Sequence, residues 1–473
     1  MAKTNEAKAN TPCSAYNAMA SEWTLIDDLI AGSAAMRAGS AEYLPKFDKE
    51  EAKHYSARVS NSILFSAYGD TVKSICSKPF SKALTLQGEL PTPLDGLGDN
   101  VDGQGKSLSQ LAKDIFFQFV NRGLGHILVD YPSTVAEDGT TPNLAEERSA
   151  GIMPRFINIK PEQLIGWRTE KDATGKDVLT QIRIAETQTE QVGDWGEKQV
   201  NYIRVYERDN WRLYVEGEKD EYSIDNEGIN SLGKIPLVTG YANQTGFMTA
   251  EPPLRELAET NLAHYRSDSD QRNILHYGRA ATLVTLGFSE EEADRIALGP
   301  NQRISSTRSQ SEANVFFAEI QGTAIEAGAK DVEKLEERMM MLGLQPFLRK
   351  TGNQTATGQS IDESRANCDI QAWVMSLERL LRQAYEMAAE WIGAELPEDF
   401  KVDIFNDFAI WVRAMQDVAE LIKIRQAGEL SRQTFLREVK RRALLSETLD
   451  IDEEIAAIEA EGPALGMIGM GAE

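Results

Sequence analysis

The spacing of apolar residues changes twice along the chain. Before residue 124 apolar residues recur every three or four positions, which predicts helices. The predicted helices lie within residues 21–39, 51–80 and 108–123. From 124 to 240 apolar and polar residues alternate, which is typical of strands in antiparallel sheets. From 252 onward the helical period returns, so the pattern predicts an α+β fold, mainly α.

The second half of the chain has a distinctive order of elements. A helix that begins at Pro252 is followed by an insertion with short strands, a returning helix, a small polar loop and one very long helix. In that long helix apolar residues alternate at spacings of four and three from Ala366 to Trp391. Such a stripe suits a core helix within one chain, and equally a helix that packs against a copy of itself or a neighbour.

The charge balance is strongly acidic. The 473 residues include 74 acidic and 50 basic ones, a formal net charge of −24. A protein that grips nucleic acid needs clustered Lys and Arg along the phosphates. The chain is therefore expected to touch DNA transiently, or to present a surface to which DNA must not adhere. The alternative is that the acidic surplus only maintains solubility.

The cysteines and the apolar segments indicate the cellular compartment in which the protein is expected. Cys13, Cys76 and Cys368 are far apart and form no CxxC pair, so a reducing cytoplasm is expected in place of a disulfide framework. Residues 1–17 lack the apolar core of a signal peptide. No segment approaches the roughly 20 apolar residues that span a bilayer, so no membrane partner is expected.

Motifs for chemistry are incomplete throughout the sequence. The stretch GQGKS at 103–107 ends like a phosphate-binding loop, but Asn100 stands where that pattern needs glycine. Read as a calcium loop, the same stretch has Gly98 and Ser109 at positions that need carboxylates. The four histidines lack metal-ligand spacing. We therefore expect no cofactor, no metal, no catalytic residues and no enzymatic activity.

Several short patterns, in a fixed order, carry a resemblance to a known family. They are Tyr55, Arg58 and Ser62; DNVDGQGKSL at 99–108; Leu128 to Pro132; Trp167-Arg168; Pro252, Pro253, Leu254, Leu257, Ala258, Asn261, His264, Tyr265 and Arg266; and Leu421 to Ser431. Together the chain, over roughly residues 50–460, resembles the portal proteins of tailed bacteriophages, the head-to-tail connectors. The combined order of the patterns is more specific than any one of them.

The resemblance implies a portal-type fold: a mixed α/β wing, a helical stem, a small α/β clip, a long tunnel helix and a helical crown. The implied boundaries are wing 1–250 with 396–410 returning to it, stem helices 251–280 and 323–348, clip 281–322, tunnel loop 349–360, long helix 361–395, and crown with C-terminal tail 411–473.

The same resemblance implies a function. Such a protein forms a ring, expected to contain twelve subunits, at one vertex of the virion capsid after assembly in the host cytoplasm. Double-stranded DNA passes through its channel during genome packaging and ejection, and terminase, major capsid protein and head–tail adaptor attach to it. The tunnel loop would face DNA through Arg349, Lys350, Thr351, Asn353, Gln354, Thr355 and Thr357. The clip would contact partners through Arg303, Arg308, Phe316 and Phe317.

Two other functions are compatible with parts of the sequence. The chain can be a virion scaffold or head–tail adaptor that forms no DNA channel. It can also be a soluble hydrolase that uses acidic residues, although the incomplete motifs argue against that.

Overall fold

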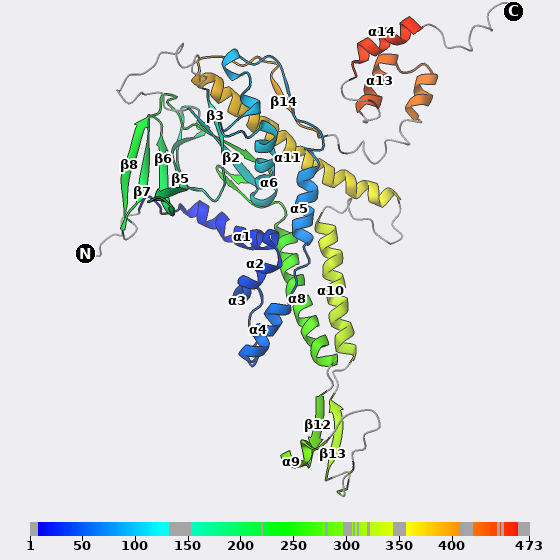
Figure 1. Ribbon diagram of the computed structural model, residues 1–473. Helices are drawn as coiled ribbons and strands as arrows, with labels where there is room; N and C mark the ends of the chain where they lie inside the picture. The colour runs from blue at the N-terminus through cyan, green and yellow to red at the C-terminus, as the bar shows by residue number, and fades with distance from the viewer. Residues whose placement is uncertain are drawn as a thin grey trace, which may run out of the picture. The chain divides into compact units, whose positions relative to one another are not determined.

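The structure is a computed structural model (Figure 1). It describes residues 8–131, 153–218, 221–279, 282–296, 305, 308–309, 312–318, 322–343, 356–406, 408, 420–441, 445 and 449–461. The chain divides into two compact units. The first comprises residues 1–353 and 372–404, and the second comprises residues 354–371 and 405–473.

Helices dominate the first 123 residues. They are α1 (Ser14–Ala31), α2 (Ser33–Ala38), α3 (Ser40–Tyr43), α4 (Ala52–Asn61), α5 (Ala67–Ser77) and α6 (Leu108–Arg122), with short 3-10 turns η1 (Thr92–Leu94) and η2 (Leu97–Asp99). The prediction of one helix over 51–80 is wrong, because the chain is extended at Ser62 and α5 starts anew at Ala67. Ser62 leaves the helix and makes a buried contact with a distant part of the chain, described below.

Two antiparallel sheets follow α6. The three-stranded sheet has the order β3 (Arg155–Ile159), β2 (Leu124–Asp130), β9 (Leu237–Tyr241). The five-stranded sheet runs in sequence order through β4 (Leu164–Lys171), β5 (Asp177–Val192), β6 (Gly196–Glu207), β7 (Asn210–Glu216) and β8 (Tyr222–Ile229). Two small pairs join β1 (Thr85–Gln87) to β14 (Lys401–Asp403), and β10 (Gln244–Gly246) to β11 (Thr249–Ala250).

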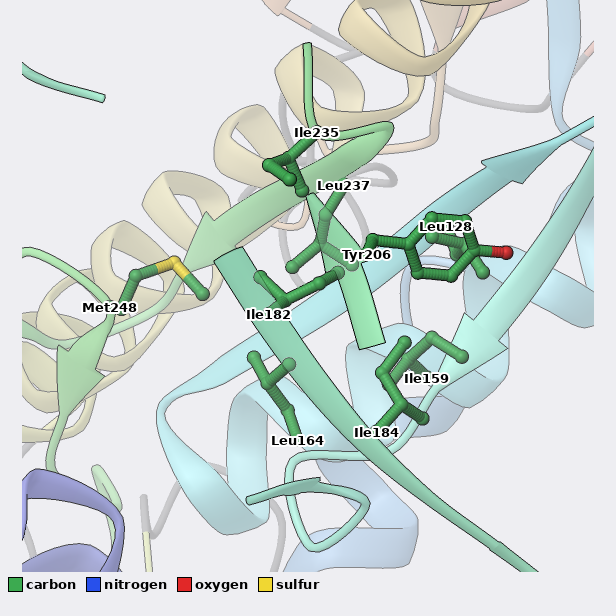
Figure 2. Close-up of a cluster of buried hydrophobic side chains, with 9 residues drawn as sticks. All are labelled: Leu128, Ile159, Leu164, Ile182, Ile184, Tyr206, Ile235, Leu237 and Met248. Carbon is green, nitrogen blue, oxygen red and sulfur yellow. The ribbon is translucent and has the colours of Figure 1, made fainter. Parts of the chain in front are cut away.

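The two sheets share an apolar core. Figure 2 shows its side chains gathered between strands of both sheets: Leu128, Ile159, Leu164, Ile182, Ile184, Tyr206, Ile235, Leu237 and Met248. Each of these is less than a tenth exposed. Because side chains two residues apart on a strand point to the same face, Ile182 and Ile184 of β5 enter this core together. The core fixes the two sheets as one body.

The β5–β6 hairpin extends beyond the rest of its sheet. β4 pairs with β5 as far as Ile184, and β7 pairs with β6 from Tyr202 onward. The remaining residues of β5 and β6 pair with each other up to Val192 and Gly196. We call residues 186–201 the arm. Most of its side chains are polar and exposed, so the apolar pattern of the sequence did not reveal it.

The helical half of the chain begins with α8 (Arg255–Arg279) and α10 (Gly322–Leu342). Figure 1 shows the two helices side by side, with the hairpin of β12 (Thr282–Leu286) and β13 (Asn314–Ala318) beyond the ends that the chain joins to it. A short helix, α9 (Glu290–Ala293), follows β12. This is the order of elements that the sequence predicted.

The long helix is α11 (Ala356–Trp391), with 36 residues. At about 1.5 Å per residue, a helix of that length extends for roughly 54 Å. Within the first unit its apolar stripe is buried by the chain itself: the Tyr385 ring lies 5.1 Å from the Phe156 ring and 5.2 Å from the Phe400 ring. Leu377, Leu381 and Ala384 are fully buried. Of the two alternatives for this stripe, the core helix is therefore correct over this part.

The second unit contains short helices near the C-terminus. Residues 420–426 are helical, and α13 (Arg432–Arg441) and α14 (Ile451–Glu461) follow. Gly428 adopts φ 82° after the first helix, and the Ser431 hydroxyl accepts a hydrogen bond from the Thr434 amide at 3.1 Å. Gly428 thus follows the end of the first helix, and Ser431 caps the start of α13.

Candidate functional site

Two patterns that are far apart in the sequence, Tyr55/Arg58/Ser62 and the one that starts at Pro252, meet in one buried polar cluster. Arg58 of α4 donates from Nε and Nη2 to the two carboxylate oxygens of Glu50, both at 2.9 Å. Its Nη1 lies 3.7 Å from Asp270 of α8. The Arg58 and Glu50 side chains are only 3% and 8% exposed, and the hydrogen bonds from Arg58 lower the pKa of Glu50. Because both charges are buried, each depends on its partner.

The same junction continues along α8. The hydroxyl groups of Ser62 and Tyr265 lie 2.6 Å apart, and both residues are buried. The Asn261 side chain accepts from the Tyr68 amide at 3.0 Å and donates to the Phe65 carbonyl at 2.9 Å. These bonds satisfy backbone groups that the break between α4 and α5 leaves without helical partners. The pattern residues therefore bind the N-terminal helices to α8.

α8 and α10 are joined by a ladder of polar contacts. His264 Nε2 lies 3.4 Å from a Glu336 carboxylate oxygen. One turn further along, the Ser267 hydroxyl bonds the Asp331 carboxylate. At the next step Gln271 donates to the Ile325 carbonyl at 2.9 Å. As residue numbers rise on α8 they fall on α10, so the helices are antiparallel, and the ladder fixes their register. We call α8 and α10 the helix pair.

The exposed side of α10 carries charges of both signs. Its exposed charged residues are Glu326, Lys330, Asp331, Glu333, Lys334, Glu337 and Arg338. The basic residues at 330, 334 and 338 are four apart, so they form one row on the helix. Acidic residues lie beside that row, so this surface has no extended field of a single sign.

The structure places the predicted clip residues in different surroundings, and one of them lies outside the described residues. Arg308 bonds the Gly287 carbonyl, and its Nη2 lies 3.1 Å from Glu292, so it holds the hairpin together. Phe316 pairs across the hairpin with Val284 and is 43% exposed. Phe317 pairs with Leu283 in the same hairpin. Arg303 lies outside the described residues.

The predicted tunnel loop lies mostly outside the described residues, which include none of Arg349, Lys350, Thr351, Asn353, Gln354 or Thr355. Thr357 is in the first turn of α11, since that helix begins at Ala356 and not at residue 361. The predicted loop boundary is therefore wrong over 356–360. Gly358 favoured a loop, yet one glycine costs a long helix only about 1 kcal/mol.

The stretch at 99–108 forms a closed turn. Asp102 accepts hydrogen bonds from the Gln104 and Lys106 amides, and Asn100 accepts one from the Gly105 amide. These amides are thus already bonded to the chain's own side chains. Ser107 then caps α6 in a reciprocal capping box with Gln110. The pattern has a structural explanation here, as a turn that leads into α6.

Sequence reasoning missed the partners of the pattern residues. Asp270 and Glu336 were not singled out, because their contacts join helices far apart in sequence, and Glu50 was not, because only the packing of the loop before α4 brings it to Arg58. A short pattern that contains a buried arginine does signal that an acidic partner is needed. It does not say which of the 74 acidic residues provides it.

The described residues offer neither a metal site nor a helix that could span a membrane. Within the part of the chain that the structure describes, no group of three or more His, Cys, Asp or Glu side chains is arranged to hold a metal ion. Among the described helices, none combines the length and apolar character needed to cross a membrane.

Comparisons with known proteins give limited matches. Residues 253–392 match a family described as a domain of unknown function, DUF4055, and this segment runs from just before α8 to just after α11. No curated protein matches the sequence. Among solved structures, a chain in a virion of a native gene transfer agent particle is 12% identical with a TM-score of 0.41, over 85% of this chain and 97% of that one.

Two neck structures give similar values. A chain in the neck of a native gene transfer agent particle, computed with C12 symmetry, has 12% identity and a TM-score of 0.40, covering 79% of this chain and 89% of that one. A chain in the neck of an empty particle, computed with C6 symmetry, has the same identity and TM-score, covering 88% and 98%. Because these identities and scores are low, the function of this chain has to be inferred from its own residues.

Proposed function

We propose that the chain is a portal protein of a tailed bacteriophage: a ring at one capsid vertex through which double-stranded DNA is packaged and ejected. The observation that carries this proposal is the order α8, β12–β13 hairpin, α10, residues 349–355 and α11, bound to the N-terminal helices by the Ser62, Arg58 and Tyr265 contacts. In this assignment the helix pair is the stem, the hairpin is the clip and residues 349–355 are the tunnel loop.

The helix pair suits a load-bearing wall. α8 has 25 residues, and three polar contacts with α10 fix its register. At about 1.5 Å per residue the helix is roughly 38 Å long. The buried Arg58 and Tyr265 contacts attach α8 to the N-terminal helices. Any force that moving DNA exerts on such a wall would therefore be borne by two helices held together, and not by a single helix.

The electrostatics suit a conduit. Affinity for duplex DNA grows with the number of phosphates that Lys and Arg neutralise. A net charge of −24, and mixed signs on α10, oppose tight retention of DNA. Between Lys350 and α11 the sequence TGNQT is small and uncharged, which allows brief contact, while Arg349 and Lys350 supply the phosphate-directed charge.

The partners follow from the same assignment. The exposed Phe316 of the clip offers an apolar contact to terminase or to a head–tail adaptor. The rest of the ring would sit against the major capsid protein. The protein would have no catalytic role and no cofactor, because the motor chemistry belongs to the terminase.

Electron microscopy of the purified full-length protein, viewed down the symmetry axis, tests this proposal. We expect a closed ring of about twelve subunits with a pore wide enough to admit duplex DNA. A closed oligomer without a pore would favour the alternative of a head–tail adaptor or scaffold. A protein that stays monomeric at all concentrations, with and without capsid protein, would contradict the ring itself.

A further inference from the structure

The arm ends in an almost fully exposed tryptophan. Trp195 lies in the turn between β5 and β6 and is 98% exposed, and the neighbouring Val192 is 55% exposed. The two paired strands of the arm are mostly polar, and the Thr187 hydroxyl bonds the Asn201 side chain across them at 3.0 Å. A tryptophan in water presents a large apolar surface that contact with a partner protein would bury. The arm therefore carries an apolar anchor at the end of a polar extension of roughly 20 Å, at about 3.3 Å per residue.

A groove with both apolar and polar lining lies beside the start of β5, the end of that strand far from the arm tip. The groove has a volume of about 480 Å³ between β9–β10 and α11, and its apolar lining includes Leu179, Tyr241, Phe247 and Met387. Phe247 is 40% exposed. The volume of the groove falls within the range of pockets that hold compact apolar groups.

The groove is built on an unusual turn. Met248 has a backbone φ of 59°. This left-handed conformation is uncommon for residues other than glycine. The turn is held by the Tyr241 hydroxyl, which accepts from the Met248 amide at 3.1 Å. Met248 is thereby buried at 2% exposure while its neighbour Phe247 stays exposed on the groove. Strained turns are kept where a fixed presentation of side chains is needed.

The positions of the two features suit one kind of contact. Leu179 lies near the start of β5, and the arm tip follows the end of that strand. At about 3.3 Å per residue, the groove and Trp195 are therefore roughly 40 Å apart along one strand. A chain cannot fill its own groove across that distance. A ring is made by heterologous contacts, in which one face of each subunit meets a different face of the next.

We propose that Trp195 of one copy of this chain inserts into the groove lined by Phe247 and Tyr241 of the next copy. This inference rests on the proposed ring, because a heterologous ring needs an anchor and a receiving surface at two different places on each subunit. The arm then acts as a clasp between neighbouring subunits.

Thiol cross-linking tests this contact directly. In a full-length C13S/C368S background, which keeps the buried Cys76, the D194C/Q244C variant places one thiol beside Trp195 and one on the groove, and it is treated with a short bis-maleimide. We expect a ladder of covalent dimers and larger oligomers. The matched control D194C/F316C keeps the thiol beside Trp195 and moves the second thiol to an exposed residue outside the groove, so it should give no ladder.

Substitution of the anchor gives a second readout. W195A should raise the concentration needed for half-maximal assembly at least tenfold, while E197A on the same arm should leave it unchanged. Both variants should unfold at the temperature of the wild type, since Trp195 is almost fully exposed within its own chain.

The outcomes separate this inference from the proposed function. Rings that give no D194C/Q244C ladder, or a W195A variant that assembles like the wild type, would contradict the Trp195 contact and leave the proposed ring standing. A wild-type protein that never self-associates would overturn both. A ladder from oligomers that lack a pore would support the clasp while contradicting the DNA channel.

Discussion

The hydroxyl groups of Ser62 and Tyr265 lie 2.6 Å apart, although 203 positions separate the two residues in the chain. Ser62 also donates to the Val59 carbonyl at 2.7 Å, so the Tyr265 hydroxyl acts as donor to Ser62. The contact explains why α4 ends at Asn61: its next residue is used to bind α8. Two separate patterns of the sequence are thus parts of one joint.

Removal of the Ser62 hydroxyl and removal of the Tyr265 hydroxyl should lower the free energy of unfolding by different amounts. S62A leaves the Tyr265 hydroxyl buried without an acceptor and should lower the free energy of unfolding by about 1–3 kcal/mol. Y265F should cost about 0.5–1.5 kcal/mol, because Ser62 keeps its bond to Val59. Denaturant unfolding measures both. The S62A/Y265F double variant should cost less than the sum, and strict additivity would contradict a direct bond.

Loss of the buried ion pair should lower the free energy of unfolding far more than loss of a surface pair. R58A leaves the Glu50 carboxylate buried without its cation, and we expect a loss of about 3–5 kcal/mol in the free energy of unfolding. The matched control is K73A, which breaks the exposed contact with Asp70 and should cost less than about 1 kcal/mol. Equal losses in urea titrations of the two variants would show that the Arg58 pair is not structurally important.

His126 should make stability depend on pH. Complete burial lowers its pKa to about 3, well below the ordinary value of about 6.5. Between these values the unfolded chain binds a proton that the folded chain does not, so stability is full above about pH 6.5 and falls as pH drops. From pH 7 to pH 5 this residue should cost about 2 kcal/mol.

The His126 contribution can be isolated by substitution. The H126Q variant should lose about 2 kcal/mol less than the wild type over the same pH interval, whatever its stability at pH 7. Urea unfolding at the two pH values measures this difference. An identical pH dependence in both proteins would mean that His126 becomes protonated in the folded state, against its burial next to Thr239.

Charge reversal in the proposed tunnel loop should affect DNA and not assembly. The R349E/K350E variant should form rings like the wild type, because assembly is assigned to other surfaces. Particles assembled with it should contain at least tenfold less packaged DNA, since two positive charges per subunit are replaced by negative ones. Electron microscopy checks the rings, and nuclease-protected DNA per particle checks packaging. Normal packaging would contradict the assignment of this loop.

Local periodicity predicted much of the fold. The four-three spacing in α11 identified side chains such as Leu377 and Ala384 that the structure buries. The alternation of apolar and polar residues between 124 and 240 predicted antiparallel strands, such as the pair of β6 and β7. Such elements are predictable because each buries one face, and burial imposes a regular spacing of apolar residues.

Features that depend on long-range contacts were not predictable. The break between α4 and α5 exists because Ser62 bonds Tyr265, and the local sequence shows only a continuous helical pattern. The arm was missed because its two strands are mostly polar on both faces, so the sequence there lacks the apolar alternation that predicts a strand. The partner of Arg58 was missed because only the packing of α4 against the preceding loop selects Glu50.

The helix pair and residues 349–355 are assigned to the wall of a DNA channel. An electron cryomicroscopy reconstruction of the assembled protein, with side chains resolved, tests this assignment most directly. We predict a ring in which α8, α10 and residues 349–355 of every subunit face a central pore, with the β12–β13 hairpins together at one end. A ring with the helix pair on its outer surface, or with residues 349–355 directed away from the pore, would contradict it.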